Sequence, residues 1–244
     1  MQGVFITGTD TGVGKTTVAV ALIHCLSRSL RTGAYKPVAS GAEATPSGPV
    51  WTDAEHLQAA VAAGLQRDIP DAWICPQRFV APLAPPVAAR LEGREVDAGL
   101  LRSGIAPWAG RVEAIVVEGA GGWLAPLTET ESVADVARDF GLPVLVVARL
   151  GLGTLNHTLL TLEAIERRGL KVAGIVMNEA EPRNRDNRQS QAEVGNPDEL
   201  ARRCAVPILA VCPWRADTDL LRDDAFRKMD WTKILGQFSP AILS

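Results

Sequence analysis

Residues 8–17 carry the residue types of a phosphate-binding loop. An apolar stretch, Val4–Thr7, predicts a short strand ahead of them, and Gly14-Lys15-Thr16-Thr17 opens a segment with the apolar stripe of a helix. The backbone N–H groups of such a loop are unsatisfied and face outward, so they can hold phosphate oxygens together with the positive end of the helix dipole. Lys15 would then reach the terminal phosphates, and the hydroxyl of Thr16 would bind Mg²⁺.

The spacing of this loop is a variant of the usual one. The motif G-x-x-x-x-G-K places Thr9 where its first glycine belongs and puts Gly8 one position early. A flexible Gly/Thr loop is the simpler alternative, but it leaves the Gly-Lys-Thr-Thr run unexplained. We therefore predict that the loop binds the phosphates of a nucleotide.

Polar side chains also follow two further predicted strands. Residues 32–36 predict a strand that ends on Lys36, and Ser40 lies in the Gly- and Pro-rich run behind it. A buried strand over residues 114–117 delivers Glu118 into a Gly-Ala-Gly-Gly turn. Because ligands bind at the carboxyl ends of parallel strands, we expect these side chains to converge on the phosphate-binding loop. Phosphoryl transfer requires fixed positive charge, which two lysines and Mg²⁺ would supply.

Two carboxylates could complete a Mg²⁺ site with Thr16. Mg²⁺ prefers hard oxygen ligands, and Glu118 or Asp53 supplies them. Glu118 is the stronger candidate, because an acid between a buried strand and a glycine-rich turn is costly to place there without a cation; an acid that caps the next helix is the alternative. Asp53 stays open, since Thr52-Asp53 could equally begin a helix. The scattered cysteines and histidines show no zinc spacing.

Alternating strand-length and helical patterns predict an α/β fold, with a mostly parallel sheet flanked by helices in three layers. Strands are expected at 4–7, 32–36, 114–117, 143–148, 172–177 and 208–211, and helices at 15–30, 53–63, 87–91, 98–109, 132–140 and 155–168, from Asn196 onward, and at 226–235. The length of 244 residues suits one domain over 1–244, with a mobile insertion at 179–196 and a tail at 216–244.

The bulk composition indicates a soluble globular chain. Hydrophobic residues make up 47% and charged residues 22%, and the net charge of -3 argues against nucleic acid as the main partner. No apolar run is long enough for a membrane span, and no export signal is evident, so we expect a cytoplasmic protein.

Three motifs together resemble one family. The segments T-G-T-D-T-G-V-G-K-T, Y-K-P-V-A-S-G and V-V-E-G-A-G-G-W, followed by L-G-L-G-T-L-N-H-T and I-V-M-N, are similar to those of dethiobiotin synthetases over most of residues 3–215. The resemblance implies a homodimeric P-loop enzyme of biotin synthesis. Its substrates would be 7,8-diaminononanoate, CO₂ or bicarbonate, and MgATP, and it would close the ureido ring of dethiobiotin through a phosphorylated carbamate.

Carried over to matching positions, the resemblance implies a role for each motif. The phosphates would be held by Gly12, Val13, Gly14, Lys15, Thr16 and Thr17. The Mg²⁺ would be bound by Thr16, Asp53 and Glu118. The nucleotide would be lined by Glu118, Gly119, Ala120 and Gly121. Lys36 would be the catalytic lysine beside Lys15, with Thr11 and Ser40 on the diamine or carbamate. Asn178, Pro213, Trp214 and Arg215 would hold adenine, and the helix start from Gly153 to Asn156 would bind the substrate carboxylate across the dimer interface.

The chain also departs from the family pattern. Gly12 stands where some members carry Glu, so no side-chain contact is carried over there. Residues 180–196 and those after 215 do not match.

Two rival functions use a similar loop. A partitioning-type or septum-positioning ATPase carries an extra lysine early in the loop, where this chain has Asp10, and needs a basic surface that is absent. An amidoligase acting on a corrinoid would need an attached glutaminase domain, for which 244 residues leave no room. A non-catalytic binding module would not need two lysines and two acids around one phosphate site.

Overall fold

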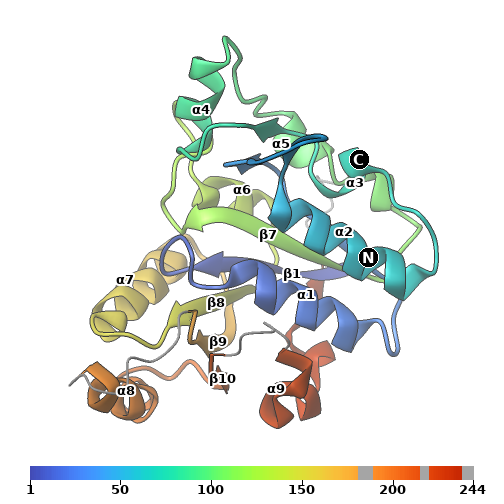
Figure 1. Ribbon diagram of the computed structural model, residues 1–244. Coiled ribbons are helices and arrows are strands. Elements are labelled where there is room, and N and C mark those ends of the chain that lie inside the picture. Colours follow the sequence, from blue (N-terminus) through green and yellow to red (C-terminus); the bar gives the residue numbers. More distant parts are fainter. Residues whose placement is uncertain (181–188, 215–219, 238–244) are drawn as a thin grey trace.

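A parallel sheet forms the centre of the computed structural model, which describes residues 1–180, 189–214 and 220–237 (Figure 1). Its strands follow the order β10-β9-β8-β1-β7-β2. They are β1 Gln2–Gly8, β2 Thr32–Tyr35, β7 Ala114–Gly122, β8 Val144–Arg149, β9 Val172–Asn178 and β10 Ile208–Cys212. Strands β1, β7 and β8 are almost wholly buried and rich in Val and Ile, as expected for strands covered on both faces. The predicted α/β class is confirmed.

Helices cover both faces of this sheet. Helices α1 (Lys15–Leu26), α2 (Thr52–Leu65) and α9 (Asp224–Lys228) lie on one face, and α6 (Val133–Phe140), α7 (Thr154–Arg167) and α8 (Gln189–Arg203) on the other (Figure 1). The connection from β1 to β2 runs in one direction across the sheet, whereas those from β7 through β10 run in the opposite one. Right-handed crossovers in opposite directions place their helices on opposite faces. The reversal next to β1 leaves a crevice at the carboxyl ends of the strands.

The long segment between β2 and β7 builds a wall above this crevice. It contains two small sheets that the sequence patterns did not predict, because their strands are only two or three residues long. The elements are β3 Ala39–Ser40, β4 Glu43–Thr45, β5 Gly48–Val50, α3 Asp71–Ile74, β6 Arg78–Phe79, α4 Pro85–Leu91, α5 Leu100–Ser103 and the 3₁₀ turn η1 Ala106–Trp108. Strand β3 pairs with β6 in parallel, which fixes Ser40 beside Phe79.

Several expected element bounds are wrong. The helix expected at 98–109 is interrupted at Gly104, where a Cβ would lie 2.5 Å from the hydroxyl of Tyr35. The helix expected at 226–235 is α9 followed by the 3₁₀ turn η3 (Trp231–Ile234). Beyond it, β11 (Gly236–Gln237) pairs antiparallel with the start of β1. A further 3₁₀ turn, η2 (Leu220–Arg222), precedes α9.

Two other differences bear on the site. Helix α8 begins at Gln189, seven residues ahead of Asn196 and with Pro197 inside it. The expected insertion at 179–196 thus lies partly in α8, and its residues 181–188 are outside the described part of the chain. Strand β7 continues through Gly122, so Glu118 lies inside a strand and not in a turn. Among the described residues no helix is long and apolar enough to cross a bilayer.

Helix α6 begins with a reciprocal capping box. The backbone N–H of Ser132 donates to the Asp135 carboxylate at 2.9 Å, and Arg168 donates to its other oxygen at 2.5 Å. Burial raises the pKa of Asp135, but the hydrogen bonds from Ser132 and the charge of Arg168 outweigh it and lower that pKa to about 2. The ionised form is therefore bound more tightly in the folded state than in the unfolded chain.

Asp135→Asn is expected to lower the free energy of unfolding at neutral pH by about 1 kcal/mol, because solvent screens part of the interaction of this partly exposed carboxylate. Since the folded pKa is depressed, this contribution is complete above the ordinary pKa near 4 and is lost as the pH falls toward about 2. Urea unfolding across that range would measure it, with the exposed Asp198→Asn on α8 as control. A stability difference that stays constant down to about pH 2 would contradict the assignment.

Candidate active site

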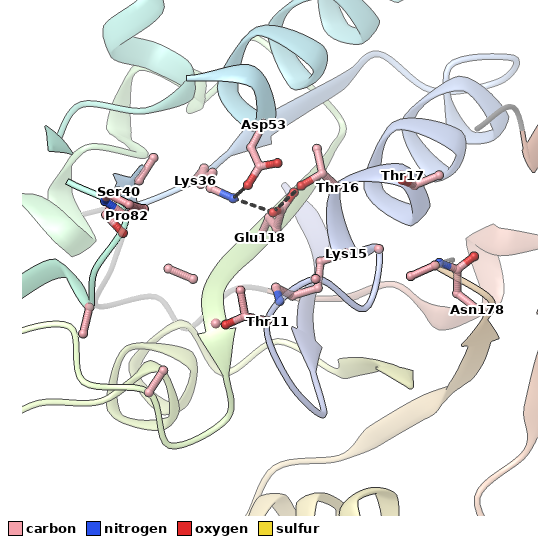
Figure 2. Close-up of a pocket in the computed structure, with 18 of the residues that line it drawn as sticks. Thr11, Lys15, Thr16, Thr17, Lys36, Ser40, Asp53, Pro82, Glu118 and Asn178 are labelled. Carbon is pink, nitrogen blue, oxygen red and sulfur yellow. Dashed lines mark hydrogen bonds and ion pairs between the residues drawn. The ribbon is translucent and has the colours of Figure 1, made fainter. Parts of the chain in front are cut away.

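A cavity of about 740 Å³ opens at the carboxyl edge of the sheet. Figure 2 shows the phosphate-binding loop, Lys36 and the segments that carry Ser40 and Pro82 around one space. We call the side formed by Ser40 and Pro82 the Ser40 wall. Its lining combines the ends of strands that are distant in sequence: Thr11, Gly12, Gly14, Lys15, Thr16, Thr17, Lys36, Ala39, Ser40, Asp53, Pro82, Leu83, Ala84, Pro85, Glu118, Ala120, Gly121, Ala125, Asn178, Glu179, Ala180, Pro213, Trp214 and Leu220. The volume and the mixed polar and apolar walls suit small-molecule ligands.

The loop between β1 and α1 turns through left-handed backbone at two glycines. Gly12 has φ +74° and Gly14 φ +90°, conformations that a side chain disfavours. Lys15 folds back over the loop and its Nζ donates to the carbonyl of Asp10 at 3.0 Å. Burial lowers the pKa of Lys15, although the charge of Glu118 opposes that shift.

The early Gly8 also has a structural reason. A Cβ there would lie 2.7 Å from the carbonyl oxygen of Asp10 and 3.1 Å from Nζ of Lys15. The loop therefore folds back over Gly8 too closely for any side chain. Gly8 is therefore needed because the Asp10 carbonyl and Lys15 lie against it, while Thr9 occupies the position of the motif's first glycine.

Asn178 holds the same loop from the end of β9. Its Nδ2 donates to the carbonyl of Val13 at 3.0 Å, and the residue is only 5% exposed. A Cβ on Gly14 would lie 2.2 Å from that nitrogen. Asn178 thus faces the cavity and at the same time fixes the backbone of the phosphate-binding loop.

Lys36 lies between two carboxylates, Asp53 and Glu118, in the lining of the cavity (Figure 2). Its Nζ contacts Glu118 Oε1 at 2.6 Å and Asp53 Oδ2 at 2.7 Å. The hydroxyl of Thr16 donates to the same Glu118 oxygen at 2.8 Å. Tyr35 pairs with Val117 in the β2–β7 ladder, so the next residues along, Lys36 and Glu118, are delivered side by side.

This arrangement keeps Lys36 charged. Burial lowers the pKa of Lys36, but the charges of Glu118 and then of Asp53 outweigh it and raise that pKa above its ordinary value. For Asp53, burial raises the pKa and the ammonium of Lys36 more than reverses it, so the pKa is lowered. A buried ammonium held in its charged form can act on developing negative charge without a proton transfer.

The oxygens around Lys36 fit a hard cation. Glu118 is fully buried; Thr16 and Lys36 contact its Oε1, while its Oε2 has no hydrogen-bond partner. Asp53 keeps about half of its side chain exposed toward the cavity. No group of three or more Cys, His, Asp or Glu side chains in the described ranges is placed to hold a metal. Two carboxylates and a hydroxyl suit Mg²⁺, which retains several waters.

The two ends of the cavity differ in character. Apolar residues line the end beyond Ser40, where Pro82, Leu83 and Ala84, followed by Pro85 at the start of α4, supply much of the wall. At the other end Trp214 is 40% exposed, and its backbone N–H donates to Glu179 at 2.9 Å. Glu179 and Leu220 were not predicted as lining residues, because no motif contains them.

Some predicted residues lie outside the lining. Val13 is buried below the loop, and a Cβ on Gly119 would face Val133 and Phe5 in the core, so neither side-chain position faces the cavity. Gly153 and Asn156 begin α7 and do not line the cavity of this chain. Arg215 lies outside the described residues.

The fold and the loop define a P-loop nucleotide-binding domain. The septum site-determining protein MinD of Pyrococcus horikoshii, complexed with Mg-ADP, superposes with a TM-score of 0.50 at 16% identity, covering 95% of this chain and 88% of that one. A plasmid partition protein of Borrelia burgdorferi bound to AMPPNP gives 0.51 at 14%, covering 95% of each. A family model described as an AAA domain matches residues 2–220.

Much closer relatives identify the family. An ATP-dependent dethiobiotin synthetase BioD of Anaeromyxobacter dehalogenans is 50% identical over 218 residues, covering 89% of this chain and 92% of its own. A second, from Escherichia coli, is 36% identical over 214 residues, covering 87% and 91%. The chain belongs to the family of ATP-dependent dethiobiotin synthetases and is an enzyme.

Gly14→Ala is expected to weaken nucleotide binding by about a hundredfold. The new Cβ adds strain at a positive φ and also displaces Asn178 from Val13. Gly12→Ala is the matched control, since its φ is also positive but nothing lies within 4 Å of its Cβ. Calorimetric titration with a non-hydrolysable ATP analogue would compare them. Equal losses in the two variants would show that strain alone accounts for the effect.

Proposed function

We propose that this enzyme makes dethiobiotin from 7,8-diaminononanoate, CO₂ and MgATP. One amine of the diamine adds to CO₂ and loses a proton to give a carbamate. A carbamate oxygen attacks the γ-phosphorus and ADP leaves. The second amine then attacks the carbamate carbon and displaces phosphate, which closes the ureido ring. The supporting evidence is the family membership together with the geometry of one cavity.

One observation supports this reaction best: Lys36 lies between the phosphate-binding loop and the Ser40 wall (Figure 2). Nucleotide phosphates on one side and a carbamate on the other would both lie near its ammonium. The negatively charged phosphoryl group that moves from ATP to the carbamate would then stay close to a fixed cation throughout the transfer. Lys15, on the loop, would stabilise the leaving diphosphate.

The remaining site residues take the roles of their motifs. Gly12 to Thr17 would hold the phosphates, and Asn178, Pro213 and Trp214 would contact adenine; all of these except Val13 line the cavity, which supports the assignment. Thr11 and Ser40 face the same space as Lys36 and would contact the diamine or carbamate. The apolar wall at Pro82–Pro85 suits the hydrocarbon part of the substrate.

Thr16, Asp53 and Glu118 would hold the Mg²⁺ of MgATP. The hard oxygen donors and the unpartnered Glu118 Oε2 support this assignment. When bound, Mg²⁺ supplies positive charge to the β- and γ-phosphates. Lys36 would then exchange part of its carboxylate contact for the transferred phosphoryl group.

The substrate carboxylate would bind at the start of α7 in a second copy of the chain. Gly153 and Asn156 do not line the cavity formed by the described residues of this chain, which supports a site that a second copy completes. Leu152, in the loop ahead of α7, and Leu160, within α7, are 69% and 56% exposed and leave apolar surface for a homodimer contact. A helix N-terminus attracts a carboxylate through its free N–H groups.

A partitioning-type ATPase is the alternative function. The solved structures of that kind resemble this chain in fold alone. Asp10 stands where their extra loop lysine would be, and it accepts the N–H of Thr11 at 2.7 Å within its own loop. An acidic residue at that position does not supply the cation that such a switch places across a dimer.

The purified protein with 7,8-diaminononanoate, bicarbonate and MgATP is expected to form dethiobiotin and ADP in equal amounts. Mass spectrometry of the product and a coupled ADP assay would measure them. Omission of the diamine is the control and should reduce ADP formation to a low background. ATP turnover that is indifferent to the diamine would overturn the assignment in favour of the ATPase alternative.

Lys36→Gln is expected to reduce turnover by at least about a hundredfold, because it removes the cation that faces the transferred group. Nucleotide binding should stay measurable, since Lys15 and the loop amides remain. Turnover and nucleotide affinity are measured on the same preparation, with thermal unfolding to check that the buried site still folds. Loss of nucleotide binding in parallel with turnover would assign Lys36 to the scaffold and not to the chemistry.

A further inference from the structure

Asn196 is a buried polar residue that the roles above leave unexplained. It is 8% exposed and lies inside α8, on the helix that packs against α7. The sequence pattern predicted that a helix begins at this position, whereas α8 begins at Gln189. In the structure its side-chain amide instead donates to the carbonyl of Leu150 at 2.9 Å and to that of Gly151 at 3.4 Å. These carbonyls belong to the loop between β8 and α7.

This contact determines how the loop presents its amide groups. In a trans peptide the C=O and the following N–H point in opposite directions. Because Asn196 draws the carbonyls of Leu150 and Gly151 toward α8, the N–H groups of Gly151 and Leu152 point away from α8. Neither of these N–H groups has a backbone acceptor within the described ranges. The loop thus offers directed donors just ahead of the N-terminus of α7.

The rest of the loop is fixed by backbone contacts. The N–H of Leu150 donates to the carbonyl of Asn178 at 3.2 Å, and the N–H of Thr154 donates to Gly151 at 3.2 Å. Gly153 then takes φ +89° to start the helix. Without Asn196, the carbonyl of Leu150 would lose its buried donor and the peptide planes at 150–152 could rotate. Asn196 is therefore the side chain that sets their orientation.

We propose that Asn196 is a positioning residue for the substrate carboxylate, acting through the orientation of residues 150–153. This proposal rests on the proposed function, in which the start of α7 receives that carboxylate. Asn196 touches neither substrate nor nucleotide. It holds two carbonyls away from the anion and so keeps the neighbouring amide donors directed toward it.

Asn196→Asp tests the proposal with almost no change of shape. Its carboxylate cannot donate, and it would repel the two carbonyls that the amide attracts. We expect KM for the diamine to rise about tenfold, with kcat and KM for MgATP changed less than about twofold. Asn196→Ala should show the same selective effect with a smaller rise. Asp198→Asn, on an exposed position of α8, is the matched control and should behave as the unaltered enzyme.

A second measurement separates positioning from general damage to α8. The same diamine with a methyl group in place of the carboxylate should be a poor substrate for the unaltered enzyme. In Asn196→Asp the kcat/KM ratio between the two substrates should shrink about tenfold, because the variant has already lost the carboxylate interaction. Thermal unfolding would confirm that both proteins are folded.

The outcomes are distinct. The positioning role would be overturned if the ratio of kcat/KM between the two substrates were unchanged in a folded Asn196→Asp enzyme. It would also be overturned if kcat fell and KM for MgATP rose as much as KM for the diamine. Either result would leave Asn196 a packing role. An unaltered enzyme that forms dethiobiotin but ignores the carboxylate would also overturn it, while the reaction itself would stand. No dethiobiotin from the unaltered enzyme would overturn both.

Discussion

The site depends on one buried ion pair, between Lys36 and Glu118. Both side chains are nearly inaccessible, and their closest atoms are 2.6 Å apart. Removing Lys36 would leave the buried Glu118 carboxylate without its ammonium partner, at a cost of about 3–5 kcal/mol, whereas removing Glu118 would leave Lys36 paired with Asp53 alone. The pair is therefore unlike a surface salt bridge: it makes the two strand ends mutually dependent and keeps an ammonium charged inside the cavity. Asp53 and Thr16 extend the same group toward the nucleotide.

The fold creates this pair through strand register. The β2–β7 ladder sets Tyr35 opposite Val117, and β1 lies beside β7 with Ile6 opposite Glu118. The phosphate-binding loop leaves β1 at the same edge, so Thr16 reaches the Glu118 carboxylate from the first turn of α1. The reversal of connection direction next to β1 keeps helices from covering this edge. Nucleotide phosphates and a second substrate can thus share one space with Lys36 between them.

Sequence patterns predicted the parts of the site that short motifs carry. Four site residues could be found because each comes after a strand of buried residues, and the carboxyl ends of parallel strands meet at one edge of the sheet. They are Lys15, Thr16, Lys36 and Glu118. The Pro82–Pro85 wall, Glu179 and the strand β11 could not, because short, irregular segments take their position from tertiary contacts and not from local periodicity. Asn196 shows the same limit: the local pattern predicted a helix start there, but α8 begins at Gln189, and the Asn196 side chain contacts the carbonyls of Leu150 and Gly151.

The central claim is that the γ-phosphoryl group passes to a carbamate held beside Lys36 and not to water. The most direct test uses ¹⁸O-labelled bicarbonate in unlabelled water, with the diamine and MgATP, sampled before the label exchanges with solvent. Because ring closure breaks the bond between the carbamate carbon and the phosphorylated oxygen, the account predicts that the released phosphate carries one labelled oxygen. Phosphate without label, formed at the rate of ADP release, would show that water receives the phosphoryl group and would contradict the account.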